Sequence, residues 1–271
     1  MPQPARSQSC WDLAVDLAAH HAHARADTVA SGDREIFQVS TISALVDGVF
    51  TGDTPYSEIM EHGDFGVGTF NALDGEMAAV DGQFYHLRED GSVTGVDPQE
   101  LTPFAAVTFF RGEAELDLAH PYLRDELLTW VDSTVPSDNL FYAIRVDGVF
   151  DSVTTRTVRR QHHPYTGLLD AAKGQAEMTF TDTSGTIVGF RAPQYAQGMT
   201  VAGYHLHFVD DDRKVGGHVL NFSIRSGTVR LDLETDLHVE MPTSPEFLDA
   251  DLDGDDVSDA IEQSENVSGR S

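Results

Sequence analysis

Three histidines in the second half of the chain have a spacing that suits metal binding. His205 and His207 lie two residues apart in an apolar run, and His218 follows a short segment that is rich in Asp and ends in Gly-Gly. Side chains alternate between the two faces of a β-strand, so the first two histidines share a face while Leu206 points the opposite way. We expect Val209–Gly217 to form a hairpin connection that returns His218 beside the pair.

Three neutral imidazoles that converge without a nearby cysteine suit a divalent transition metal such as zinc. Three protein ligands leave a coordination position open for water or substrate, which is typical of a catalytic site rather than a structural one. A single histidine in a strand is more often a packed or hydrogen-bonded residue. The spacing therefore predicts a metal site but names no reaction.

Four blocks of the sequence, taken in order, resemble the α-acetolactate decarboxylase family. The resemblance spans roughly residues 40–265, and four blocks in register are far more specific than any one of them. The blocks are H62-G-D-F-G-V-G-T-F-N-A-L-D-G-E-M77, T102-P-F-A-A-V-T-F-F110, F141-Y-A-I-R-V-D-G-V-F150, and G189-F-R-A-P-Q-Y195 with V201-A-G-Y-H-L-H-F208 and G216-G-H-V-L-N-F222.

The resemblance implies decarboxylation of 2-acetolactate to acetoin and CO2. Loss of CO2 from this β-keto acid leaves an electron pair that delocalises onto the ketone oxygen as an enediolate. A zinc ion, or another divalent transition metal, held by the three histidines would stabilise that charge as a Lewis acid. No organic cofactor is then required, and the sequence has neither a dinucleotide-binding turn in a βαβ context nor a phosphate loop.

The resemblance also implies roles for four further residues. Arg145, in the apolar segment Phe141–Val149, is expected to contact the substrate through its planar guanidinium. Glu76 is expected at the metal, as a ligand or as a proton-handling group. Glu265 is the candidate proton donor in the C-terminal tail, and Thr69 is expected to hydrogen-bond the substrate.

Each of these four assignments has an alternative. Arg145 could form an internal salt bridge, since a charge in an apolar strand is costly unless it is paired. Glu76 could be a solvated carboxylate of a hairpin, and Thr69 an ordinary strand residue. Glu262 could be the true counterpart of Glu265, because the tail is acidic throughout. The identity of the protonating glutamate stays open.

Composition limits the class of protein. The 271 residues are 40% hydrophobic, which fits a globular chain with a sizeable core. No stretch approaches the length of about twenty apolar residues that a membrane span needs. Asp12 and Asp16 interrupt what would be the apolar region of a secretory signal, and the single cysteine, Cys10, cannot form an internal disulfide. We expect a cytoplasmic protein with no membrane partner.

The charge balance is strongly acidic. Forty-five acidic residues against 17 basic ones give a formal charge of −28, and only Lys173 and Lys214 are lysines. Such a surface repels itself at ordinary ionic strength, and molar salt removes most of that repulsion. We therefore predict a halophilic host with a salt-rich cytoplasm. The same charge argues against nucleic-acid binding, which needs clustered Lys and Arg.

The order of predicted elements favours an α+β fold of two mainly β-sheet-based halves with few short helices. The resemblance implies the same arrangement, as two tandem α/β lobes. We predict a flexible N-terminal arm over residues 1–35, an N-terminal sheet lobe over 36–160, a C-terminal sheet lobe with the metal site over 161–245, and an acidic tail with a short helix over 246–271. Glycine turns such as Ser226-Gly227 are expected to separate the later strands, which are Leu140–Val146, Ala176–Asp182, Thr186–Arg191, Gly203–Val209, His218–Arg225 and Thr228–Leu233.

Two other functions are compatible with the histidine spacing. A cupin-like metal oxygenase also carries His-x-His and a later His, usually with a carboxylate ligand a few residues after the pair, and Asp210–Asp212 lies in that region. A non-catalytic metal-binding or sugar-binding module could have kept the same triad. A homodimer is implied by the family resemblance alone.

Overall fold

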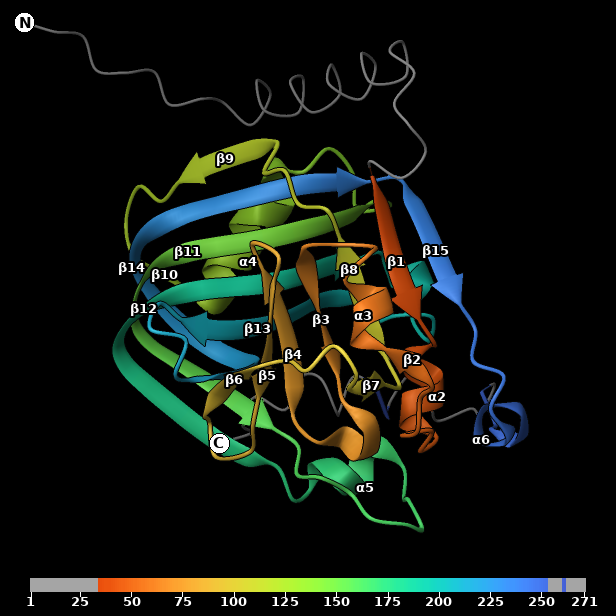
Figure 1. The fold of residues 1–271 in the computed structure, drawn as a ribbon. Helices are drawn as coiled ribbons and strands as arrows, with labels where there is room; N and C mark the ends of the chain where they lie inside the picture. Colours follow the sequence, from red (N-terminus) through yellow and green to blue (C-terminus); the bar gives the residue numbers. More distant parts are fainter. Residues whose placement is uncertain (1–33, 253–259, 262–271) are drawn as a thin grey trace, which may run out of the picture.

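Two β-sheets that pack face to face form the core of the computed structural model, which describes residues 34–252 and 260–261 (Figure 1). The first sheet has seven strands in the order β15-β1-β8-β3-β4-β5-β6. Its neighbours pair antiparallel except β1 and β15, which are parallel. The bounds are β1 Glu35–Val39, β3 Phe65–Thr69, β4 Glu76–Val80, β5 Gln83–Leu87, β6 Val93–Gly95, β8 Ala105–Thr108 and β15 Asp236–Glu240.

The second sheet is built from three unusually long strands. Its order is β10-β14-β11-β12-β13, and β9 also pairs with β14. Because β13 pairs with the start of β14 as well, the strands β14, β11, β12 and β13 form a closed ring of pairings. The bounds are β9 Ala114–Asp117, β10 Tyr122–Leu123, β11 Phe141–Thr157, β12 Ala176–Ala192, β13 Gly203–Asp210 and β14 Gly216–Glu234.

A row of glycines lets the long strands approach closely where they bend (Figure 1). Gly148 of β11 lies opposite both Gly185 of β12 and Gly227 of β14. A Cβ atom on Gly227 would come within 2.2 Å of the Asp147 carbonyl oxygen, so no side chain fits there. Glycine inside a strand commonly marks such a bend, and register shifts in β11 follow directly after the row. The predicted turn at Ser226-Gly227 is therefore wrong.

Short helices cover the outer faces of the sheets. The longest of the described helices, α4, packs Leu127, Leu128 and Val131 on the face of the second sheet that points away from the first. Helix α3 contributes Tyr56 and Ile59 to the apolar cluster on the outer face of the first sheet. The helices are α2 Ile42–Val46, α3 Tyr56–Ile59, α4 Arg124–Thr134, α5 Leu168–Ala172 and α6 Pro245–Asp249, with 3-10 turns at Asn71–Leu73 and Gln194–Ala196 and a two-stranded ribbon of β2 Thr54–Pro55 and β7 Leu101–Thr102.

The predicted fold class is confirmed: the described chain is mainly β-sheet in two sheets with short helices. The strands of the two sheets are not divided at residue 160, the predicted limit between the lobes. Residues 114–157, placed in the lobe 36–160, form β9, β10, α4 and β11 and belong with the second sheet, whereas β15, placed in the lobe 161–245, joins the first. Pairing in space does not follow chain order, because β11 and β9 find their partners in β14, and β15 finds its partner in β1.

The predicted terminal segments fall mostly outside the described residues. The arm 1–35 lies there except for its last two residues, and β1 already begins at Glu35. Of the tail 246–271, the structure describes most of α6 and the helical pair Ala260 and Ile261, both buried. Among the described helices, none has the length and apolar character needed to cross a membrane.

Candidate active site

The hairpin of β13 and β14 brings the three predicted histidines together. His205 and His207 point to the same face of β13, while Leu206 points into the cluster around α4. His207 lies directly opposite His218 in the ladder. The three ring centroids are 5.1, 5.2 and 5.3 Å apart, and one nitrogen from each ring lies within 4.8 Å of the others. The predicted hairpin and the predicted convergence are both confirmed.

The histidines are deeply buried, which favours their neutral form. Their exposed fractions are 9% for His205, 0% for His207 and 3% for His218. Burial, aided by the positive charge of Arg156, lowers the pKa of His205 to about 3. A neutral imidazole keeps a lone pair available, which is the form that ligates a metal.

The first sheet orients one of these rings. His207 Nδ1 lies 2.7 Å from the carbonyl oxygen of Met77 on β4, so this nitrogen donates and the proton is on Nδ1. Its Nε2 then carries the lone pair and lies 3.8 Å from Glu76 Oε2. Metal-binding histidines typically have their second nitrogen held in this way by a carbonyl or carboxylate. The site therefore depends on contacts between the two sheets.

The donor set fits a divalent transition metal. Zinc–nitrogen bonds are about 2.0–2.1 Å long, so the nitrogens of a tetrahedral site lie about 3.4 Å apart. The three nitrogens lie within 4.8 Å of one another, so the rings have to draw together by at most about 1.4 Å to hold one ion. Three nitrogen ligands and no cysteine suit zinc or a similar ion, and among the described residues this triad is the one such cluster of three.

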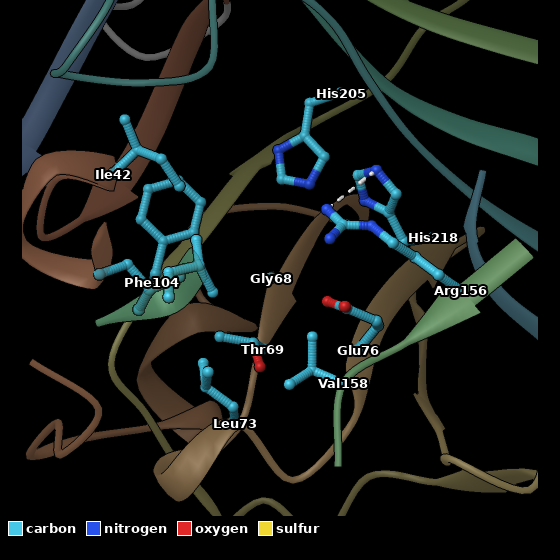
Figure 2. A pocket seen from close by; sticks show the side chains of 12 residues that line it. Ile42, Gly68, Thr69, Leu73, Glu76, Phe104, Arg156, Val158, His205 and His218 are labelled. Atoms are coloured by element: carbon cyan, nitrogen blue, oxygen red, sulfur yellow. Dashed lines mark hydrogen bonds between the residues drawn. The ribbon is translucent and has the colours of Figure 1, made fainter. Parts of the chain in front are cut away.

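His205 and His218 open onto a pocket with one polar and one apolar side (Figure 2). The hollow encloses about 420 Å³, including the part that opens to solvent. Figure 2 shows His205, His218, Arg156 and Glu76 facing one another across it. The apolar wall comes largely from α2, the 3-10 turn before β4, and the segments around Phe104 and Val158; it consists of Ile42, Leu45, Leu73, Phe104, Val158 and Leu168.

The structure does not bring Arg145 to this pocket. Its Nε lies 2.7 Å from Asp147 Oδ2, and its Nη1 lies 2.6 Å from Asp81 Oδ1. Burial alone would lower its pKa, but the two carboxylates outweigh burial and raise it. Arg156, eleven positions later on β11, lines the pocket instead, is 3% exposed, and places Nη2 3.5 Å from His218 Nε2. The internal salt bridge is thus the observed state of Arg145, and Arg156 replaces it as the candidate substrate contact.

Arg156 was missed because the predicted strand ended eleven residues too early. β11 continues to Thr157, where Arg156 is the ladder partner of His218. The continuation V149-F-D-S-V-T-T-R-T-V158 is rich in valine and threonine, which favour strands. That composition, had it been followed, would have placed a buried arginine at the end of a long strand.

Two of the other predicted residues reach the pocket. Glu76 and Thr69 both line it, at the start of β4 and the end of β3. Thr69 Oγ1 donates to the Gly75 carbonyl oxygen at 2.7 Å, so toward the pocket it can only accept a hydrogen bond. Glu262 and Glu265 lie outside the described residues. Ile261, just before them, packs into the apolar cluster that includes the pocket wall.

The aspartates after the histidine pair are engaged in the hairpin turn. Asp210 Oδ1 accepts from the backbone N–H groups of Lys214 and Val215, at 2.6 and 2.9 Å. Asp212 pairs with the Lys214 ammonium at 2.7 Å. These contacts hold the turn, so neither carboxylate joins the triad as the fourth ligand that a cupin-like site would use.

Comparison with known proteins agrees with this geometry. The model of the family described as alpha-acetolactate decarboxylase matches residues 36–254. The protein of that name from Methylococcus capsulatus is 47% identical to this chain, and the match covers 86% of this chain and 90% of the relative. The protein of that name from Raoultella terrigena is 40% identical, and the match covers 98% of both chains. The crystal structure of alpha-acetolactate decarboxylase from Bacillus subtilis strain 168 superimposes with a TM-score of 0.84 at 44% identity, covering 86% of this chain and 99% of that one. The chain belongs to the alpha-acetolactate decarboxylase family.

Proposed function

We propose that this protein decarboxylates 2-acetolactate to acetoin and CO2 in the pocket beside the histidine triad, with zinc as its cofactor. The observation that carries the proposal is the cluster of three buried imidazoles, two of which line one hollow together with Arg156 and Glu76, in a chain of this family. The two sides of the pocket suit the substrate. Its carboxylate, hydroxyl and ketone match the polar side, and its two methyl groups match the apolar wall.

The reaction breaks the bond between the carboxylate carbon and the carbon that carries the hydroxyl. CO2 leaves, and the electron pair stays on that carbon and delocalises onto the ketone oxygen. A divalent metal held by the triad would supply Lewis-acid stabilisation of this negative charge. Arg156 presents a planar guanidinium that suits the carboxylate or a polarised oxygen of the substrate, in a buried site where charge interactions are strong.

A proton must then reach the carbon that CO2 has left. Glu76 is a candidate because its carboxylate lies at the triad and its side chain is only 12% exposed. Glu262 and Glu265 stay candidates on the family resemblance. When each is substituted by Gln, the variant that lacks the proton donor should form no acetoin, while the other two should keep measurable turnover. Metal content, measured on each purified variant, separates a lost proton donor from a lost ligand.

The central experiment is an acetoin assay on purified protein. Racemic acetolactate should release CO2 and acetoin, a chelator should stop the reaction, and zinc should restore it. Elemental analysis should return about one zinc per chain, and His207→Ala should lose both metal and turnover. Protein that carries metal but yields no acetoin would contradict the proposal. Bound iron together with oxygen uptake would indicate the cupin-like alternative.

A further inference from the structure

We propose that His86, a buried residue outside the pocket, is a positioning residue for Glu76. The inference rests on the proposed function, since it concerns how the pocket carboxylate is held. His86 lies on β5 and is 1% exposed. In the ladder it faces Met77, the residue after Glu76. It is not among the residues that line the pocket.

The loop that leads into Glu76 is unusually strained. It joins β3 to β4, and both Leu73 and Glu76 line the pocket. Ala72 and Leu73 have φ angles of +64° and +52°, in the left-handed region that side chains disfavour. Gly75 follows with φ +90°. A conformation of this kind persists only where surrounding contacts fix it.

His86, on the neighbouring strand β5, supplies one of these contacts with the loop. Its Nε2 forms a hydrogen bond with the main-chain carbonyl oxygen of Asp74. A carbonyl only accepts, so Nε2 carries the proton and donates. A Cβ atom on Gly75 would lie 3.0 Å from that same Nε2, which shows how closely the ring supports the backbone. Thr69 holds the next carbonyl, that of Gly75, at 2.7 Å.

The ring itself is held by stacking. Phe70 lies against it, with ring centroids 3.6 Å apart and planes 14° from parallel. Because stacking limits rotation of the ring, the hydrogen bond from the ring holds the Asp74 carbonyl, and with it the loop, in one position. The hydrogen bond from His86 thereby fixes the backbone conformation at residues 74 and 75. That conformation in turn fixes the direction in which the Glu76 side chain points from the start of β4.

Two amide variants of different reach test the inference on the full-length metal-loaded protein. In His86→Gln the side-chain amide falls near the position of Nε2 and can still donate to Asp74. In His86→Asn it falls near Nδ1 and cannot reach. His62→Asn is the matched control, because His62 also stacks on a phenylalanine, Phe37, but does not line the pocket.

Two readouts are needed, one of them independent of activity. In His86→Asn we expect hydrogen–deuterium exchange of residues 72–76 to rise at least tenfold and kcat to fall at least tenfold. Metal content should be unchanged and KM for acetolactate within threefold of wild type, because the histidine ligands lie on other strands. His86→Gln should recover most of both losses, and His62→Asn should behave as wild type.

Equal losses in the Gln and Asn variants, or wild-type loop exchange in His86→Asn, would overturn the positioning role. A wild-type protein that makes no acetoin would instead remove the proposed function, and the exchange measurement would still test the loop. The Gln and Asn variants differ by one methylene, so a general loss of stability affects both and is recognised by their melting temperatures.

Discussion

The two arginines of β11 show how the place of a residue along one strand decides its role. Arg145 is held between Asp81 and Asp147, so both of its charge-assisted contacts are used within the protein. Arg156 lies beside His218, and its Nη1 contacts the uncharged oxygen of Gln175 at 3.2 Å. A buried guanidinium in the lining of a pocket suits contact with an anionic substrate.

Replacing each arginine by lysine should separate these roles. Arg156→Lys keeps the charge but loses the planar fork, and a charge-assisted hydrogen bond contributes about 1.5–3 kcal/mol. We therefore expect kcat/KM for acetolactate to fall about tenfold to a hundredfold, with metal content unchanged. Arg145→Lys should keep kcat/KM near wild type. Steady-state kinetics with elemental analysis checks both, and the opposite pattern would restore Arg145 as the substrate contact.

At the scale of elements, local patterns predicted well and long-range pairing did not. β13 begins at the predicted Gly203 and ends one residue after the predicted Val209. The β13–β14 hairpin followed from the Asp-rich segment and the double glycine. Both signals lie within a few residues of one another.

The bounds of the long strands were predicted wrongly for a physical reason. Gly185 and Gly227 were interpreted as breaks, because glycine in a short window favours turns. Their actual role depends on Gly148, which is distant in sequence and lies opposite both. Arg156 was missed for the same reason, because it lies beside His218 only when β11 continues through the bend. The candidate histidines, Glu76 and Thr69 needed no such pairing to be found.

A buried carboxyl at the end of β14 makes one element sensitive to pH. Glu234 is 1% exposed, and Thr108 of β8 donates to its Oε1 at 3.2 Å, which links the two sheets. Burial, and next the negative charge of Asp232, raise its pKa to about 8 from the model-peptide value of 4.5. Glu113 acts in the same direction, while the Thr108 hydrogen bond and Arg111 oppose it.

The sign of the effect follows from proton linkage. Between about pH 4.5 and pH 8 the folded protein keeps the proton on Glu234 and the unfolded chain releases it, so this group lowers stability as pH rises and adds no further change above pH 8. Glu234→Gln keeps an acceptor for Thr108 and removes the titration. Its melting temperature should exceed that of wild type by several degrees at pH 8 and match it near pH 4.5. Exposed Glu240→Gln, the control for removing one charge, should show no such pH-dependent gain.

The whole molecule is dominated by its charge. Several arginines bridge two carboxylates each, as Arg225 does with Asp151 and Asp182, and Arg191 with Asp132 and Asp138. Exposed pairs such as those of Arg225 contribute about 0–1 kcal/mol each. With 17 basic residues against 45 acidic ones, they leave most of the acidic surface unbalanced. The remaining repulsion opposes the compact state.

Salt therefore weakens both the attraction within ion pairs and the repulsion between the excess acidic groups. The larger of these two effects decides whether the melting temperature rises or falls. Raising ionic strength from 0.1 to 1 M shortens the Debye length from about 10 to about 3 Å, which weakens exposed ion pairs but also removes repulsion across the surface. With a net charge of −28, we expect the repulsion to be the larger quantity, so the melting temperature should rise steadily from dilute buffer to several molar KCl. Sucrose at equal osmolality is the control, because it favours compact states without screening charge. A midpoint that stays level or falls in KCl would show that the arginine bridges outweigh the net charge, and the prediction of a salt-rich cytoplasm would fall with it.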